Sequence, residues 1–234
     1  MGAIFRREFC SFFTSSIAYV FLAVFFLSSG YFFKLSNLDG LTTDMSGVFS
    51  SIFLVIVILV PILTMKSFSE EKKEKTEQGL LTAPVSLGGI VLGKYFASLL
   101  MYTIGISIVW LYAIILSGFG EVAWNMILAN YAALILVGAA FIAITTLISA
   151  LTENQMVSAV VGVLVLFILY MFEYIAGNVE IDFISNLCVT LSFYEKYYEF
   201  TCGIFNLSSV LFFISTAVIF NFLTVRVFEK RRWS

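Results

Sequence analysis

The chain has 234 residues, of which 61% are hydrophobic, 17% aromatic and only 12% charged, and its formal net charge at pH 7 is −2. Soluble globular domains are about 45–50% apolar and about 25% charged, so this composition argues against a soluble enzyme, a nucleic-acid-binding protein and a disordered chain. The sequence contains no histidine, which excludes Ser-His-Asp hydrolysis and histidine-ligated zinc sites.

The residues before the first long apolar stretch predict a helix in the membrane interface. Phe5, Phe9 and Phe12 recur at helical spacing, while Arg7 and Glu8 fall on other faces. This pattern fits a separate helix that lies in the interface, or the inner end of a longer first helix.

Six apolar stretches are long enough to cross a bilayer as helices, which takes about 20 residues. They cover residues 15–33, 48–65, 89–116, 124–149, 157–177 and 204–227. Because each stretch is continuously apolar rather than alternating, helices are favoured over the strands of a membrane barrel. We therefore expect an all-α integral membrane protein with residues 1–234 in a single transmembrane domain.

The distribution of basic residues predicts the orientation of these spans. If the N-terminus is cytoplasmic, Lys34 and Lys196 are the two among 13 basic residues that fall outside. The positive-inside rule requires such a bias, and six spans then place both termini in the cytoplasm. We expect a multi-pass protein of the cell membrane, in contact with lipids and not with nucleic acid.

The segment between the second and third spans is the most charged part of the chain, with eight charged residues among the twelve from 66 to 77. Glu71 and Lys75 have the i,i+4 spacing that stabilises helices. A short apolar run follows over residues 80–86. It either presents Leu80, Leu81 and Val85 to a soluble partner, or is a solvated loop whose leucines dip into the interface.

A near match to a phosphate-binding loop begins the third span. Gly88, Gly93 and Lys94 have the required spacing, but Tyr95 stands where the motif needs Ser or Thr. No loop has room for an ATPase domain. We instead expect the glycines to allow close helix contact and Lys94 to reach the inner lipid headgroups. Small residues such as Gly138 and Gly162 mark further helix-packing faces.

The outer part of the chain offers a candidate pathway and a cap. Glu173, beside Tyr170, is an intramembrane carboxylate that either lines a path or reaches the outer headgroups, and Thr64 adds a polar group in the second span. Residues 178–203 mix aromatic and charged side chains, which fits a helical cap or an aromatic belt. Cys188 and Cys202 lie there, and we expect unpaired thiols because two cysteines make no disulfide framework.

Several of these segments together resemble the permeases of the ABC-2 type exporter superfamily. The resemblance rests on the runs 65–72, 75–76, 80–86 and 90–95, and on the opening residues 5–8 and the loop 151–155. The chain is most similar to the short permeases of gliding-motility ABC transporters. That branch usually has glycine where this chain has Lys75 and leucine where it has Gly79.

The resemblance implies that the six helices form half of an exporter, which a second permease copy or a homologous permease completes. ATP and magnesium would be bound by a separate ABC ATPase subunit, so the chain itself would be no enzyme and carry no cofactor. An elbow helix would contain Phe5, Arg6, Arg7 and Phe9. The loop 66–88 would hold a coupling helix on the ATPase, with Glu70, Glu71, Lys72, Thr76, Leu80, Leu81, Pro84 and Val85 at the contact.

Two other functions fit the sequence less well than a permease. A membrane-embedded enzyme needs a cluster of catalytic groups at one depth, whereas the spans offer a lone carboxylate at Glu173. A channel or scaffold without energy coupling would tolerate a scrambled segment 66–86 of unchanged length and charge. The permease accounts for the most features, while the substrate cannot be inferred from the sequence.

Overall fold

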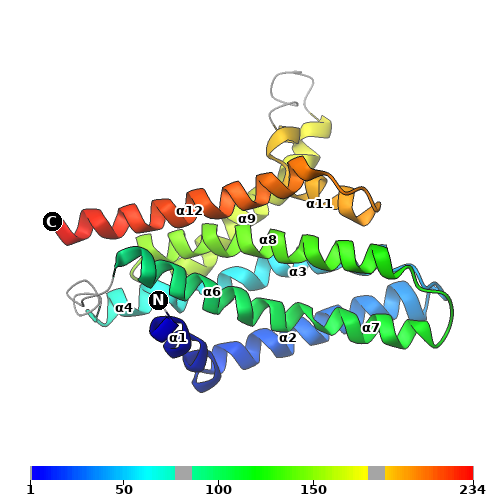
Figure 1. Ribbon diagram of the computed structural model, residues 1–234, viewed down its shortest axis with the longest axis horizontal. Coiled ribbons are helices and arrows are strands. Elements are labelled where there is room, and N and C mark those ends of the chain that lie inside the picture. Colours follow the sequence, from blue (N-terminus) through cyan, green and yellow to red (C-terminus); the bar gives the residue numbers. More distant parts are fainter. Residues whose placement is uncertain (1, 77–85, 179–187, 234) are drawn as a thin grey trace.

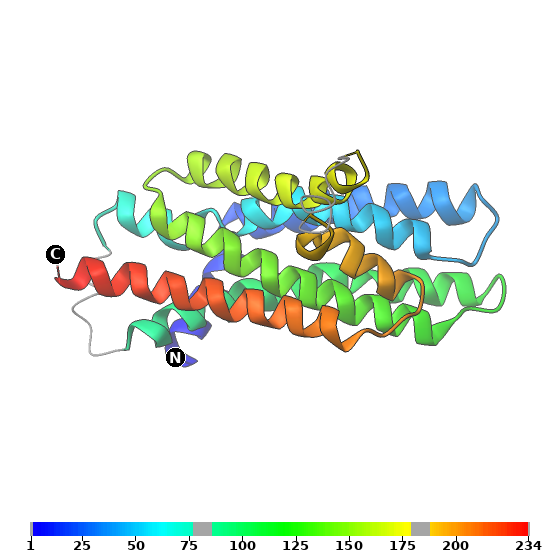
Figure 2. The ribbon, with the colours of Figure 1, turned by 90° about the horizontal axis from the view of Figure 1, so that it is seen from above.

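The computed structural model describes residues 2–76, 86–178 and 188–233, and within these ranges the regular structure is helical, without strands. The helices are α1 (Gly2–Thr14), α2 (Ser16–Phe33), the π-helix η1 (Lys34–Leu38), α3 (Ser46–Thr64), α4 (Lys66–Lys73), α6 (Leu87–Ile106), α7 (Ile108–Ser117), α8 (Trp124–Leu151), α9 (Gln155–Asn178), α11 (Phe193–Thr201) and α12 (Leu207–Trp233). The long helices run side by side along the longest axis of the molecule (Figures 1 and 2).

Six helical segments are long and apolar enough to cross a membrane, as the sequence predicts. They are Ser16–Leu38, Ser46–Lys73, Leu87–Ser117, Trp124–Leu151, Gln155–Ile175 and Leu207–Arg231. Each contains most of one predicted stretch, so the number and the order of the predicted spans are confirmed. The all-helical fold class is confirmed for the described residues.

Two spans differ in detail from the prediction. The first helix continues through η1 to Leu38, five residues beyond the predicted end of the span at residue 33. The third span is divided at Ser107 into α6 and α7, and the Ser107 hydroxyl donates to the Ile104 carbonyl at 2.6 Å. Serine hydroxyls that bond to the preceding turn compete with the backbone ladder and bend helices.

The helices α3 and α8 form the centre of the bundle. In an apolar stretch of 18 residues from each of their spans 67% of the residues are buried, against 22% in the corresponding stretches of α9 and α12. The outer helices therefore turn broad apolar faces away from the core, as expected where the solvent is lipid. Both termini lie in the half of the bundle that also contains α4 (Figure 1).

Glycines allow close helix contacts at three positions predicted from the sequence. A Cβ on Gly138 would overlap the ring of Tyr102, and one on Gly162 would lie 2.8 Å from the Cβ of Pro61. A Cβ on Gly93 would lie 3.0 Å from Ile4, so α1 packs directly on α6. The expectation is wrong for Gly88, where open space surrounds the Cβ position.

The described part of the predicted outer cap contains α11, which is packed into the bundle. Phe193, Tyr197 and Phe200 are buried, and the Tyr197 hydroxyl donates to the Phe49 carbonyl of α3 at 3.1 Å. Residues 179–187 of that cap lie outside the described residues. Cys188 is buried and Cys202 exposed, and both are free thiols, as expected.

Candidate functional site

The N-terminal helix α1 is a separate element rather than the inner end of a longer first helix. Ser15 leaves the helical conformation between α1 and α2, and its hydroxyl accepts a hydrogen bond from the Ile17 amide at 3.3 Å. In Figure 1, α1 is seen nearly end-on while α2 runs along the bundle. The rings of Phe5 and Phe9 stack at 6.0 Å, and Arg6 is exposed.

The charged segment after the second span forms the helix α4, which follows α3 through a turn at Met65. Ser149 of α8 caps this turn: its hydroxyl accepts from the amides of Phe68 at 3.1 Å and Ser69 at 3.2 Å, and donates to the Met65 carbonyl at 3.1 Å. The first amides of a helix have no acceptor within that helix. Ser149 supplies one and thereby attaches α4 to α8.

An apolar contact also holds α4 in place. The ring of Phe68 lies 4.7 Å from the ring of Phe228 on α12, measured between centroids. Ile90 and Val91 of α6 and Ala150 of α8 complete this small cluster, which is separate from the main core. Helix α4 is therefore packed against α6, α8 and α12 at once.

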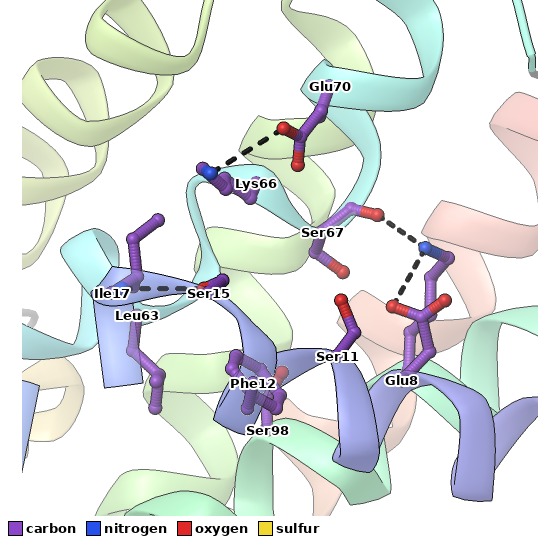
Figure 3. Close-up of a pocket in the computed structure, with 11 residues that line it drawn as sticks. Glu8, Ser11, Phe12, Ser15, Ile17, Leu63, Lys66, Ser67, Glu70 and Ser98 are labelled. Atoms are coloured by element: carbon purple, nitrogen blue, oxygen red, sulfur yellow. Dashed lines mark hydrogen bonds and ion pairs between the residues drawn. The ribbon is translucent and has the colours of Figure 1, made fainter. Parts of the chain in front are cut away.

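Four charged side chains from three elements meet beside α4, and we call Arg7, Glu8, Glu71 and Lys94 the hub cluster. The Lys94 ammonium lies 2.8 Å from Glu71 Oε1, 3.2 Å from Glu8 Oε2 and 2.7 Å from the Ser67 carbonyl oxygen. Arg7 donates to Glu8 at 2.6 Å and to Glu71 at 3.2 Å. The cluster joins α1, α4 and α6, and Figure 3 shows two of its contact residues, Glu8 on α1 and Ser67 on α4.

The hub cluster is compatible with burial because its charges balance. Lys94 is 3% exposed, and two carboxylates face two cations. A buried ion needs both a counter-charge and satisfied hydrogen bonds, which the Ser67 carbonyl and the carboxylates supply here. The hydrogen bond to Glu8 raises the pKa of Arg7 above its usual value, so the guanidinium remains charged.

Two expectations about these charges are wrong. Lys94 does not reach the inner headgroups, because carboxylates from α1 and α4 face it inside the protein. The i,i+4 pair of Glu71 and Lys75 does not form either. Helix α4 ends at Lys73, Lys75 has a left-handed backbone with φ of 58°, and Glu71 turns inward to Lys94 and Arg7.

A small polar cavity adjoins the hub cluster, between α1, α4 and α6 (Figure 3). Its volume is about 60 Å³, and Glu8, Ser11, Ser67 and Lys94 are among its lining residues. Since a water molecule takes up about 30 Å³ in the liquid, one or two waters fit there.

The predicted partner-facing residues divide into three groups. Glu71 belongs to the hub cluster, whereas Glu70 is half-exposed and pairs with Lys66 at 3.5 Å. Lys72 pairs with Glu153 of the loop after α8 at 3.0 Å, and Thr76 is exposed. The remaining four lie outside the described residues: Leu80, Leu81, Pro84 and Val85.

The predicted pathway residues are not all brought together. Glu173 is exposed and shares with Tyr170 an open cavity of about 400 Å³ near the C-terminal end of α9. Thr64 is buried, does not line that cavity, and donates its hydroxyl to the Val60 carbonyl of its own helix at 3.1 Å. A pathway role for these three residues stays a prediction.

Sequence reasoning missed the hub cluster and the role of Ser149. One signal was available for the first: Lys94 lies within an otherwise apolar stretch, where a buried cation needs carboxylates. No pattern links Ser149 to Phe68, because 81 residues separate them along the chain.

Comparison with known families gives one match. A family model described as ABC-2 family transporter protein matches residues 5–173, which cover α1, the hub cluster and the first five spans. No curated protein matches the chain.

Proposed function

Because the chain belongs to the ABC-2 family of transporter proteins, we propose that it is the permease subunit of an ATP-driven exporter and that the hub cluster passes force from a separate ATPase subunit to the spans. The family and the six apolar helices make the chain a multi-pass membrane protein with a role in transport. The exporter direction, the ATPase and the coupling are the proposed part.

The observation that carries the proposal is the attachment of α4 to its surroundings. Helix α4 is bound to α1 and α6 by the hub cluster, to α8 by Ser149 and to α12 by Phe68. A force on α4 therefore reaches four other helices through direct contacts. A flexible connector would need none of these contacts, and its charges would stay in water.

The family resemblance suggests roles for the other parts of the chain. Helix α1 would serve as the elbow, and residues 66–88 would contact the ATPase, which holds ATP and Mg²⁺. Both termini would lie in the cytoplasm of a cell-membrane protein, and a second permease copy or a homologue would form the other half of the path. A place in the gliding-motility branch stays part of the proposal: the chain departs from that branch at Lys75, where the left-handed backbone would suit the usual glycine.

Affinity purification of the full chain in mild detergents tests the proposal. We expect an ATPase subunit to co-purify and its hydrolysis of ATP to respond to the permease. The variant Glu71→Gln should keep the ATPase bound but lose most of that response, because Lys94 loses its nearest carboxylate. The matched variant Glu74→Gln makes the same change at an exposed position and should behave as wild type.

The alternative, a channel or scaffold without energy coupling, makes the opposite prediction. No ATPase would co-purify across several detergents, and Glu71→Gln would change transport no more than Glu74→Gln does. Either result would contradict the proposed function.

A further inference from the structure

A groove of about 480 Å³ lies between α6, α8 and α12, in the half of the bundle that contains α4. Its walls are apolar side chains such as Leu92, Phe96, Phe213 and Phe222. On α12 the lining runs from residue 213 to residue 225, about 18 Å along the helix. That length is close to half of a hydrocarbon core about 30 Å thick, so the groove spans one leaflet.

Two polar side chains line the groove, and one of them has an unused acceptor. The Tyr95 hydroxyl donates to the Ala139 carbonyl at 3.2 Å. Asn221 is 7% exposed and donates its amide to the Ala217 carbonyl at 2.8 Å. Its Oδ1 atom is buried and has no hydrogen-bond partner among the residues that the structure describes. Such an atom is destabilising unless a ligand donates to it.

The end of the groove nearer the C-terminus carries positive charge. The Arg226 guanidinium lies 4.8 Å from the ring centre of Phe222, a lining residue, and Lys230 is exposed one turn further on. Glu229 binds Arg226 at 2.6 Å. The net charge of Arg226, Glu229 and Lys230 together is therefore plus one. Along α12, Arg226 lies about 7.5 Å from Asn221.

We propose that this groove binds one anionic lipid with a hydroxyl or amide N–H next to its headgroup. The headgroup would lie at Arg226 and Lys230, and one acyl chain would fill the apolar walls. The Asn221 side chain would turn its otherwise buried Oδ1 toward the groove to accept from the donor of the lipid. A plain hydrocarbon chain would leave the Oδ1 atom of Asn221 without a hydrogen-bond donor. The site needs no ATPase and so extends beyond the proposed function.

The size of the groove favours a lipid over a helix of another protein. A helix about 10 Å across and 15 Å long occupies roughly 1,200 Å³, more than twice the volume of the groove. Known small-molecule sites have volumes of about 300–1,000 Å³. The positive charge at the end of the groove also complements a phosphate.

Native mass spectrometry of the full chain, purified in detergent, tests the site with three probes. These are 1-oleoyl lysophosphatidate, its 2-O-methyl ether and 1-oleoyl lysophosphatidylcholine. We expect lysophosphatidate to bind about five-fold more tightly than the methyl ether, which keeps the charge but lacks the donor, because one hydrogen bond is lost. The choline lipid keeps the hydroxyl but is zwitterionic, and should bind more weakly than lysophosphatidate.

Three variants test whether the lipid probes bind in the groove. In Asn221→Leu the preference for lysophosphatidate over the methyl ether should disappear, and this ratio does not depend on how much protein is folded. Val218→Trp should fill the groove and abolish binding of all three probes. Ile219→Trp, an equally exposed change on α12 away from the groove, should bind as wild type.

Two results would overturn the proposal. The first is an unchanged preference for lysophosphatidate in Asn221→Leu, since the donor would then bind elsewhere. The second is binding unaffected by Val218→Trp, together with disulfide cross-linking of two copies through Val218→Cys. That outcome would make the groove a protein interface.

Discussion

From the position of Lys94 in the hub cluster we expect that this residue contributes more to the stability of the fold than any surface ion pair of the chain does. In Lys94→Met, Glu8 and Glu71 remain beside each other, 19% and 17% exposed, with Arg7 as their one remaining close cation among the described residues. Removing one partner of a buried ion pair typically costs about 3–5 kcal/mol. The same replacement in Lys66→Met breaks a pair whose side chains are 35% and 37% exposed, which should cost at most about 1 kcal/mol.

Thermal unfolding of the purified protein in one detergent measures the difference. For a chain of this size about 1 kcal/mol corresponds to about 2–4 °C, so Lys94→Met should lower Tm by roughly 6–20 °C and Lys66→Met by less than about 4 °C. Adding Glu71→Gln to Lys94→Met restores the charge balance of the cluster and should recover part of the loss. Equal Tm values for Lys94→Met and Lys66→Met would refute a buried, structurally coupled cluster.

Three further changes test the backbone and packing by the same thermal assay. Lys75→Gly should stabilise the protein by about 1 kcal/mol, because glycine adopts the left-handed conformation of this position without steric cost; a loss of stability would contradict that geometry. Gly138→Ala should lower the stability of the protein by about 1–3 kcal/mol, because the added methyl group overlaps the Tyr102 ring. Gly88→Ala places its methyl group in open space and should leave the stability unchanged. Equal Tm changes for the two variants would contradict this packing. Tyr197→Phe should cost about 1 kcal/mol through its lost hydrogen bond to α3, and an unchanged Tm would argue against that bond.

The spans were predictable because lipid imposes a simple requirement on the sequence. About 20 consecutive apolar residues must satisfy their own backbone hydrogen bonds, so length and hydropathy alone identify them. The positions of Gly138 and Gly162 were predictable for a related reason, since close helix packing requires small residues.

The site was less predictable because it depends on contacts between distant residues. The contact of Lys94 with Glu8 and Glu71 requires α1 to pack against α6, and the bend at Ser15 and the close contact at Gly93 allow that packing. The break at Ser107 was missed because a serine within an apolar helix more often remains in the helix than interrupts it. Residues 34–38 likewise show no sequence pattern that predicts the extension of the first helix through η1.

The central claim, that an ATPase acts on this chain through α4 and the segment after it, is tested most directly by site-specific photo-cross-linking in membranes. A photoreactive amino acid at Thr76, exposed in the turn that follows α4, should trap a subunit that mass spectrometry identifies as an ABC ATPase. The same probe at Gly120, exposed in the loop after α7, should trap none. Trapping of the ATPase from position 120, with none from position 76, would contradict the account.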